Sequence, residues 1–527
     1  MTDTLTAAGL TAEEKRARLA ELLRRKAGPL RQFPLSFAQQ RLWFLDQLEP
    51  GNPAYNIISA LRMRGPLDVP AMERSVADLV RRHEPLRTIF RTSSGEPVQV
   101  VLPYRDLKLP VEALDAPEEE RDAVAHERVA REMETPFDLA RGPLFRARIL
   151  RLGEDDHVLL LGMHHIVTDG WSIGVLYREL CTSYAAYTEG REPELPALPI
   201  QYADYATWQR NNTQVLEEQL AFWRRTLAGA PALLELPLDH PRPPVQTHDG
   251  GMVRLRYPPA FGETMRSLAL RLEATSFMVV LAAFYALLAR WSGQDDIVVG
   301  TPTAGRSRRE TEALVGFFIN TIALRTRLDG DPTFEELVQR VRQTTIDAYA
   351  HQDVPFERVV DELKVERALS HSPVTQVNVI LHTEPVDPIV LGDLKLGLVE
   401  PEPASTQYEL SFSLRDRWKG MPMEFDVEYN RNLFDRATVE RMADHFHSIF
   451  MAAAADPTLR LSQLPLGDQA EREEALAKWN RTEAAYPDGP VHALVAAQAA
   501  RTPAAAAVIS SAGRLSYAEL LGRAHRL

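Results

Sequence analysis

The sequence predicts an α/β fold arranged in two lobes. Segments with helical and strand-like periodicity alternate along residues 31–466. A stretch rich in Glu, Pro and Leu, residues 189–200, separates two such sets and reads as a connection between lobes. No sequence repeat relates the two sets, so the lobes are expected from the element pattern alone.

The expected first lobe contains helices with clear start signals and one buried strand. Apolar residues at helical spacing follow Ser36, and Asp68 precedes a second helix that runs into the segment 82–90. A strand at 145–150 and a hairpin tip at 153–156 lead to the apolar run 158–161, which reads as a buried strand, and a helix at 173–188 follows.

The expected second lobe is centred on a strongly apolar helix at 276–291. Thr275 or Ser276 would cap its start, and Ser292-Gly293 would end it. The other segments are a helical stretch at 201–208, a Pro-rich loop at 231–247, strands at 296–300 and 377–381, a loop at 301–306 and a final helix at 435–455.

Composition narrows the possible classes of protein. The 527 residues carry a net charge of -13 and no long basic run, which disfavours nucleic-acid binding. A single cysteine, Cys181, rules out a disulfide framework. The longest apolar run, Phe277–Ala289, is shorter than the ~20 residues of a membrane span, and no signal peptide opens the chain. We therefore expect a cytoplasmic protein.

The first 30 residues are expected to form a helix of their own. Thr11 and Glu14 make a capping box, and Gly28-Pro29 would end the helix. This segment is either a solvated lead-in packed on the next domain or a docking element for another polypeptide.

The strongest chemical signal is the run from Met163 to Ser172, Met-His-His-Ile-Val-Thr-Asp-Gly-Trp-Ser. His164 and His165 leave the buried strand, and Asp169 and Gly170 follow within five residues. Histidines at a strand exit can act as a base, bind a reacting group, bind a metal or serve the core. Neighbouring strand residues point to opposite faces, which argues against a shared metal, and no second ligand cluster stands out. The sequence contains no G-x-S-x-G elbow, P-loop or G-x-G-x-x-G fingerprint.

These residues resemble a condensation domain of a nonribosomal peptide synthetase. His164, His165, Asp169 and Gly170 match the HHxxxDG motif of that family. Five further segments resemble other family motifs in the expected order: 36–45, 82–90, 201–208, 315–321 and 351–357. The resemblance covers roughly residues 31–466, and the ordered set is more specific than the histidine motif, which other acyltransferases share.

The last part of the chain resembles a different domain. Segments 478–482, 499–503 and 515–520 look like a linker and the opening of an adenylation domain, without that domain's phosphate loop. The expected organisation is a helix, linker or docking segment at 1–30, an N-terminal lobe at 31–200, a C-terminal lobe at 201–466, and a linker with a truncated adenylation start at 467–527. The chain is expected to be a fragment of a longer synthetase.

The resemblance implies two lobes similar to chloramphenicol acetyltransferase, arranged as a V-shaped pseudo-dimer with the active site in a tunnel at their junction. It implies a monomer whose partners are an upstream donor carrier protein, a downstream acceptor carrier protein and its own adenylation domain. The phosphopantetheine arms of the carriers would be substrates, with no metal and no tightly bound cofactor. The implied reaction of this secondary-metabolite enzyme is attack of a carrier-bound amine on a carrier-bound peptidyl or acyl thioester.

The resemblance also implies a role for each motif residue. His165 would contact the attacking amine, as a positioning group or a general base, and His164 would support the loop from the opposite face. Asp169 would hold the loop through an ion pair, with Arg87 as the preferred partner and Arg41 second. Gly170 would allow close backbone approach and offer its N–H to the oxyanion, and Trp171 and Ser172 would support the next helix.

Relatives with other chemistry remain as alternatives. The intact histidines disfavour a heterocyclising member, and the order Trp171-Ser172 disfavours an epimerising one. Met163 stands where a lactam-forming relative has a third histidine. The sequences of segments 164–176 and 351–357 resemble those of family members that accept a donor with an L-configured terminal residue, the LCL type. A starter-type N-acylating domain and a catalytically silent docking platform for a tailoring enzyme are the other readings.

Overall fold

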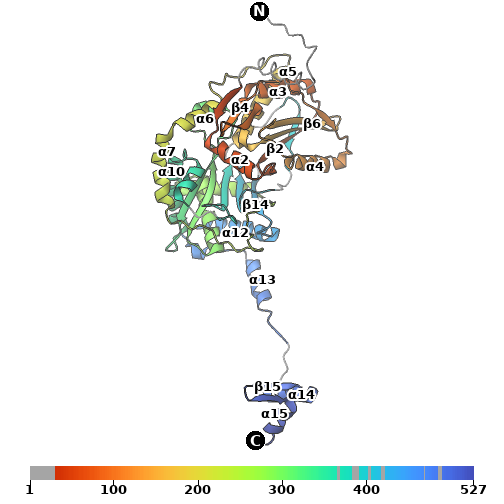
Figure 1. Ribbon diagram of the computed structural model, residues 1–527, viewed down its shortest axis with the longest axis vertical. Helices are drawn as coiled ribbons and strands as arrows, with labels where there is room; N and C mark the ends of the chain where they lie inside the picture. Colours follow the sequence, from red (N-terminus) through yellow and green to blue (C-terminus); the bar gives the residue numbers. More distant parts are fainter. Residues whose placement is uncertain are drawn as a thin grey trace, which may run out of the picture. The chain divides into compact units, whose positions relative to one another are not determined.

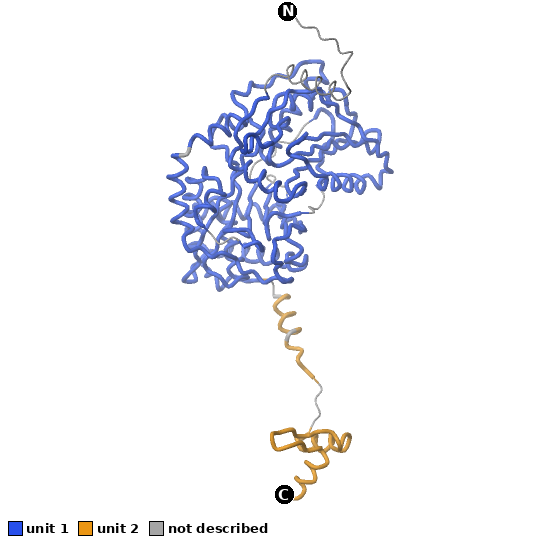
Figure 2. Tube along the Cα trace, viewed as in Figure 1, with its two compact units in different colours: residues 1–466 blue, residues 467–527 orange. Residues whose placement is uncertain are grey.

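The chain divides into two compact units, residues 1–466 and 467–527 (Figure 2). The computed structural model describes residues 30–364, 368–382, 391–400, 405–416, 422–467, 469–484 and 489–527. The helix expected within the first 30 residues falls almost entirely outside the described part of the chain.

The first half of the larger unit alternates strands and helices (Figure 1). Its strands are β1 (Arg31–Pro34), β2 (Asn56–Arg64), β3 (Thr88–Ser93), β4 (Glu96–Val101), β5 (Val111–Ala113), β6 (Phe145–Gly153) and β7 (Asp156–His164). Its helices are α2 (Phe37–Leu48), α3 (Val69–Arg82), α4 (Arg121–Met133) and α5 (Gly170–Thr188). Helices α6 (Tyr202–Asn211) and α7 (Thr213–Leu227) follow, and Leu220 and Trp223 of α7 lie in the core of the second half.

The second half has strands β8 (Gly250–Tyr257), β9 (Asp296–Thr303), β10 (Asn320–Arg327), β11 (Val377–His382), β12 (Lys395–Leu398), β13 (Leu410–Arg415) and β14 (Met423–Asn430). Its helices are α8 (Pro259–Arg271), α9 (Ser276–Ser292), α10 (Phe334–Ala350), α11 (Phe356–Leu363) and α12 (Arg436–Ala455). The smaller unit contains α13 (Gln469–Trp479), α14 (Val491–Arg501), β15 (Ala506–Ser510), β16 (Gly513–Ser516) and α15 (Tyr517–Ala524).

Three of the predicted helix starts are present, whereas the helix expected at 173–188 begins earlier, at Gly170. Ser36 and Asp68 each accept a hydrogen bond from a backbone N–H in the first turn of α2 and α3. Of the two candidates for the start of α9, Thr275 is the N-cap, and Gly293 ends that helix in the left-handed region. Local sequence therefore sets these helix ends, as capping chemistry requires.

The first large sheet has the order β12-β2-β7-β6-β5. Side chains of α3 and α5 pack on one face of it, and Ala125 and Val129 of α4 pack on the other. The central strand β7 is buried along its whole length. Burial on both faces explains why this strand reads as a continuous apolar run instead of an alternating pattern.

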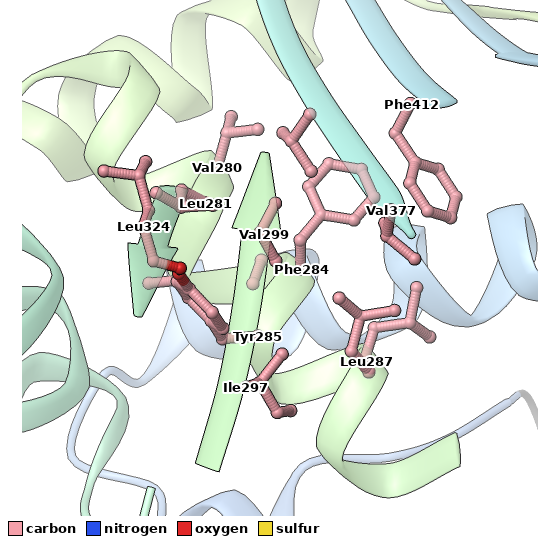
Figure 3. Close-up of a cluster of buried hydrophobic side chains, with 14 of the residues drawn as sticks. Val280, Leu281, Phe284, Tyr285, Leu287, Ile297, Val299, Leu324, Val377 and Phe412 are labelled. Carbon is pink, nitrogen blue, oxygen red and sulfur yellow. The ribbon is translucent and has the colours of Figure 1, made fainter. Parts of the chain in front are cut away.

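The second large sheet has the order β10-β9-β11-β13-β14-β8. Helix α9 is its main cover: Phe284 lies 4.6 Å from Phe412 of β13 and 4.2 Å from Phe446 of α12, between ring centroids. Figure 3 shows Phe284, Val299, Val377 and Phe412 in one cluster. The face that carries Val299, Val377 and Phe412 is buried against helices. The residues between them along each strand therefore point to the opposite face of the sheet.

The two halves are joined by an exchanged strand and by shared packing. Strand β12 pairs with β2 of the first sheet, although its residues lie in the range expected for the C-terminal lobe. A separate buried cluster joins Leu42 of α2 and Ile166 to Phe317 and Phe318, which precede β10. These links hold the two sheets at a fixed junction, beside the end of β7.

Within the described residues, no single helix combines the length and the apolar character of a membrane span. Helices α8 and α9 would satisfy that test only together, and they are bent by 99° at their break.

The packing around α9 predicts a large loss of stability for Phe284→Ala. Removing this ring leaves a cavity between α9, β13 and α12, and such changes cost about 3–5 kcal/mol of unfolding free energy. Chemical denaturation measures the loss, with Leu270→Ala, whose side chain is 83% exposed, as the control. A loss below about 1 kcal/mol for Phe284→Ala would contradict this packing.

Candidate active site

His164 is the last residue of β7 and is a buried, neutral side chain. It is 4% exposed, and its Nδ1 accepts a hydrogen bond of 3.1 Å from the Ile166 backbone N–H. Burial, with a smaller contribution from the neighbouring His165, lowers the pKa of His164 to about 3. The imidazole therefore stays uncharged and holds the turn that follows the strand.

His165 has a different environment in the short 3-10 turn His165–Val167. Its Nδ1 lies 2.7 Å from the carbonyl oxygen of Thr168. A carbonyl only accepts, so Nδ1 carries the proton and Nε2 keeps a free lone pair. The ring meets Phe317 edge-on, with centroids 4.7 Å apart. Burial is the main cause that lowers the pKa of His165, so this tautomer is neutral.

His165 lines a cavity of about 690 Å³ between the two halves of the larger unit. One wall comes from α2 and from the start of β2, and the other comes from strands of the second sheet. Arg41 of α2 forms an ion pair of 3.1 Å with Glu357 of α11 across this cavity. A second cavity of about 160 Å³ shares the lining residues Ala38, Phe317, Ile319 and Asn320.

Asp169 organises the loop that carries His165. It is the N-cap of α5 and is only 2% exposed. Its Oδ1 accepts from the backbone N–H of Ser172 at 2.8 Å and from the Ser172 hydroxyl at 2.6 Å. The same oxygen accepts from Arg306 Nη2 at 3.0 Å, and Oδ2 accepts from the Phe318 N–H at 3.0 Å. These donors satisfy a carboxylate that would otherwise be costly to bury.

Arg306 comes from the loop after β9, in the second half of the chain. Its side chain is 2% exposed, and it also donates to the carbonyl oxygens of Thr311 and Leu314. Its guanidinium carbon lies 4.0 Å from the centre of the Phe318 ring. One arginine therefore ties the loop after β9 to the Asp169 turn of the other half.

The structure corrects the expected partner of Asp169. Arg87 donates to the carbonyl oxygen of Leu102 at 2.6 Å and lies 3.5 Å from Glu84. Arg41 pairs with Glu357 instead. Both expected partners were wrong because the true partner, Arg306, is 137 residues away in sequence. The only hint of this partner in the sequence is that Gly305 and Arg306 follow a strand. A glycine and an arginine at that place predict a loop and not an ion pair with Asp169.

The remaining motif residues lie at the start of α5. Trp171 donates from Nε1 to the carbonyl oxygen of Glu312 at 2.8 Å, and Ser172 is fully buried beside Asp169. Gly170 is exposed, and a Cβ added there would meet nothing within 4 Å. No neighbouring part of the described chain therefore requires glycine at this position, and the space beside it is open.

Three of the other sequence motifs meet at the Tyr202 side chain. Its hydroxyl lies 2.8 Å from Ser36 Oγ and donates to the carbonyl oxygen of Phe317. A Cβ on Gly316 would fall 2.0 Å from the Tyr202 ring, so only glycine fits there. The segments 36–45, 201–208 and 315–321 thus meet at one side chain, and Phe317 of the last segment also contacts the His165 ring.

The described residues contain no group of three or more His, Cys, Asp or Glu side chains that could hold a metal ion. They therefore offer no candidate metal ligand set at His164 and His165.

A family model for the condensation domain matches residues 30–476. The chain is 46% identical over 503 residues to one of the subunits of the linear gramicidin synthase of Brevibacillus parabrevis, and the match covers 94% of this chain and 6% of that protein. It is 41% identical over 507 residues to phosphinothricin tripeptide synthetase PhsC of Streptomyces viridochromogenes, covering 94% of this chain and 46% of that protein. The chain therefore spans less than half the length of these curated relatives.

Solved structures show the same fold. The chain matches the X-domain from teicoplanin biosynthesis with a TM-score of 0.73 and 31% identity, over 82% of this chain and 97% of that one. A four-domain nonribosomal peptide synthetase bound to AMP and glycine matches with a TM-score of 0.80 and 24% identity, over 94% of this chain and 39% of that one.

The Asp169–Arg306 contact predicts a large coupling between these two residues. Asp169→Ala and Arg306→Ala should each lower the unfolding free energy by about 3–5 kcal/mol, because either change leaves a buried charge unpaired. The double variant should lose clearly less than the sum of the two. Denaturation of the four proteins in the cycle measures this coupling.

Arg87→Ala provides the matched control for that cycle. Arg87 does not contact Asp169 in the described structure, so its effect should add to that of Asp169→Ala within about 0.5 kcal/mol. Strong coupling of Asp169 to Arg87, with none to Arg306, would contradict the geometry.

Proposed function

This chain belongs to the condensation domain family of nonribosomal peptide synthetases, and we propose that it forms an amide bond between two carrier-bound substrates. The donor is a peptidyl or acyl thioester, and the acceptor is an aminoacyl thioester. Both are presented on phosphopantetheine arms, which enter as substrates. The observation that carries this proposal is His165, a neutral imidazole with a free Nε2 in the cavity between the two halves.

In the proposed reaction, the acceptor amine attacks the donor thioester carbonyl. The new C–N bond forms, the C–S bond breaks, and the donor carrier leaves as a thiol. His165 Nε2 accepts a hydrogen bond from the amine and so orients its lone pair toward the carbonyl. The two adjoining cavities, which share Phe317 and Asn320 in their linings, are the proposed route for the two arms.

Orientation is the larger part of the proposed catalysis. Holding two reactants in attack geometry can supply about 7–11 kcal/mol, whereas general-base help is worth about 10²–10⁴-fold, or roughly 3–5 kcal/mol. The lowered pKa of His165, caused mainly by burial, makes the imidazole a weaker base. We therefore assign His165 chiefly to positioning, with proton transfer as its second role.

The other motif residues are proposed either to hold His165 in place or to stabilise the oxyanion. His164 supports the turn from the buried side, and Asp169 fixes it against the second half of the chain. We also propose that the backbone N–H of Gly170, the first residue of α5, stabilises the oxyanion. Trp171 and Ser172 anchor the start of α5.

The proposed setting is a multidomain synthetase. Residues 31–200 and 201–466 are the two proposed lobes, and residues 467–527 are the proposed linker and start of an adenylation domain. Residues 1–30 are a proposed linker or docking segment. The long curated relatives support such a setting, because this chain matches only part of each. Upstream and downstream carrier proteins and the adjoining adenylation domain are the proposed partners.

We propose that the domain is an elongating domain of the LCL type. The sequences of segments 164–176 and 351–357 support this subtype. A starter-type domain that joins an acyl group to the first amino acid is the alternative. Parallel assays with peptidyl, fatty acyl and D-terminal donors separate these possibilities.

A silent docking platform is a second candidate function, and one observation favours it. The chain is 31% identical to the teicoplanin X-domain, and a structure of that X-domain in complex with OxyB matches with a TM-score of 0.73. The intact His164-His165 pair and the cavity beside it favour catalysis instead. An amide-forming assay with two loaded carrier proteins decides between the two.

His165→Ala should slow amide formation between two loaded carrier proteins by about a hundredfold or more, because the amine loses its orienting acceptor. Intact-protein mass spectrometry of the acceptor carrier measures the rate. The control is His126→Ala, which changes an exposed histidine on α4. Equal rates for wild type and His165→Ala would overturn the assigned role.

The single-turnover rate should depend on pH through the acceptor amine and not through His165. A free α-amino group has a pKa of about 7.7–8.0, so the rate should fall about tenfold per pH unit below that range. Because the pKa of His165 is lowered from 6.5, its neutral form persists below that value and the slope should not steepen near pH 6.5. A second tenfold-per-unit fall beginning at pH 6.5 would contradict the lowered pKa.

A further inference from the structure

Three polar side chains form a row across the second sheet, on the face opposite to its helices. Ser411 of β13 is the register partner of Asn378 on β11 and of Glu428 on β14. Register partners on adjacent strands, which lie about 4.7–4.9 Å apart, point to the same face of the sheet. All three residues line the 690 Å³ cavity that contains His165. The row therefore forms a polar floor in the same cavity as the reacting groups.

One member of the row has a hydrogen-bond acceptor that has no partner among the described residues. Asn378 is 4% exposed, and its Oδ1 is buried without a hydrogen-bond partner among the described residues. Burying such an acceptor without a partner is costly unless a ligand supplies the donor. Glu428 is half-buried; burial raises its pKa, Asp426 raises it further, and Arg415 lowers it.

Arg415, whose charge acts on Glu428, and Arg41, which lines the cavity, each form ion pairs with other carboxylates. Arg415 reaches Asp426 at 3.3 Å and Glu400 at 3.4 Å, and Arg41 pairs with Glu357. Among the described residues, the cavity lining contains three glutamates, Glu134, Glu357 and Glu428, and a single arginine, Arg41. Its charge therefore favours a cation over an anion or an apolar group.

We propose that Asn378, Ser411 and Glu428 form a subsite for a protonated amine on a substrate side chain. An ammonium group has three N–H donors, and the row presents an amide oxygen, a hydroxyl and a carboxylate. The subsite selects substrates whose side chain carries an amine, of which ornithine and lysine are examples. This inference rests on the proposed condensation reaction and adds the class of side chain that it accepts.

The test is a competition between two side chains of similar length, ornithine and norleucine. The full chain is mixed with equal amounts of ornithine-containing and norleucine-containing carrier substrates. In the first series the two amino acids are the terminal residue of the donor, and in the second series they are the acceptor. Wild type should favour ornithine in one of the two series. Glu428→Gln, which keeps the shape and removes the charge, should reduce the ornithine-to-norleucine product ratio by roughly tenfold or more.

Asn378→Leu, which keeps the number of side-chain heavy atoms and removes the amide oxygen, provides a second variant and should reduce the same ratio. Glu263→Gln on the exposed surface of α8 is the control and should leave the ratio unchanged. Thermal melting confirms that each variant is folded. If Glu428→Gln and Asn378→Leu both melt at a clearly lower temperature than wild type, the ornithine-to-norleucine product ratio of Ser411→Ala decides the test instead.

The outcomes separate the subsite from the reaction. Amide product with no ornithine preference in either series, or with a preference that the row variants do not change, overturns the subsite alone. Equal slowing of both substrates also overturns it, because that result assigns the row to the shared α-amine or backbone. No amide from any substrate pair overturns the proposed function and the subsite together.

Discussion

The geometry of the site depends on one buried carboxylate. Asp169 starts α5, ends the His165 turn and receives Arg306 and the Phe318 N–H from the other half of the chain. A buried carboxylate has few possible positions, because it loses hydration on burial and is stabilised only where its oxygens keep their hydrogen-bond donors. The position of His165 relative to the second half therefore follows from the same contacts that satisfy Asp169. This coupling makes the motif aspartate a structural residue of the junction between the halves.

Two adjacent histidines acquire unequal chemistry from their surroundings. His164 is enclosed at the end of β7, and its Nδ1 is used by a backbone N–H. His165 directs Nδ1 to the Thr168 carbonyl, which leaves Nε2 to the cavity. Burial lowers the pKa of both rings, so neither carries charge at neutral pH. A neutral ring with one fixed N–H suits an acceptor that orients an amine.

The second sheet gives the cavity its polar floor because its two faces have different partners. Phe412 and Val377 pack under α9, while their neighbours Ser411 and Asn378 point to the cavity. Alternation along the strands thus separates a face that packs in the core from a face that lines the cavity. The same sheet that holds the larger core also lines the cavity that contains His165.

The sequence by itself determined the starts of α2, α3 and α9, the buried strand before His164 and the order of the family motifs. Ser36, Asp68 and Thr275 act through neighbouring backbone groups, so local reading was sufficient for them. Only the tertiary structure decided that Arg306 pairs with Asp169, that β12 joins the first sheet and that Asn378, Ser411 and Glu428 share one row. These relations join segments distant along the chain, and periodicity and capping carry no information about which distant segments become neighbours.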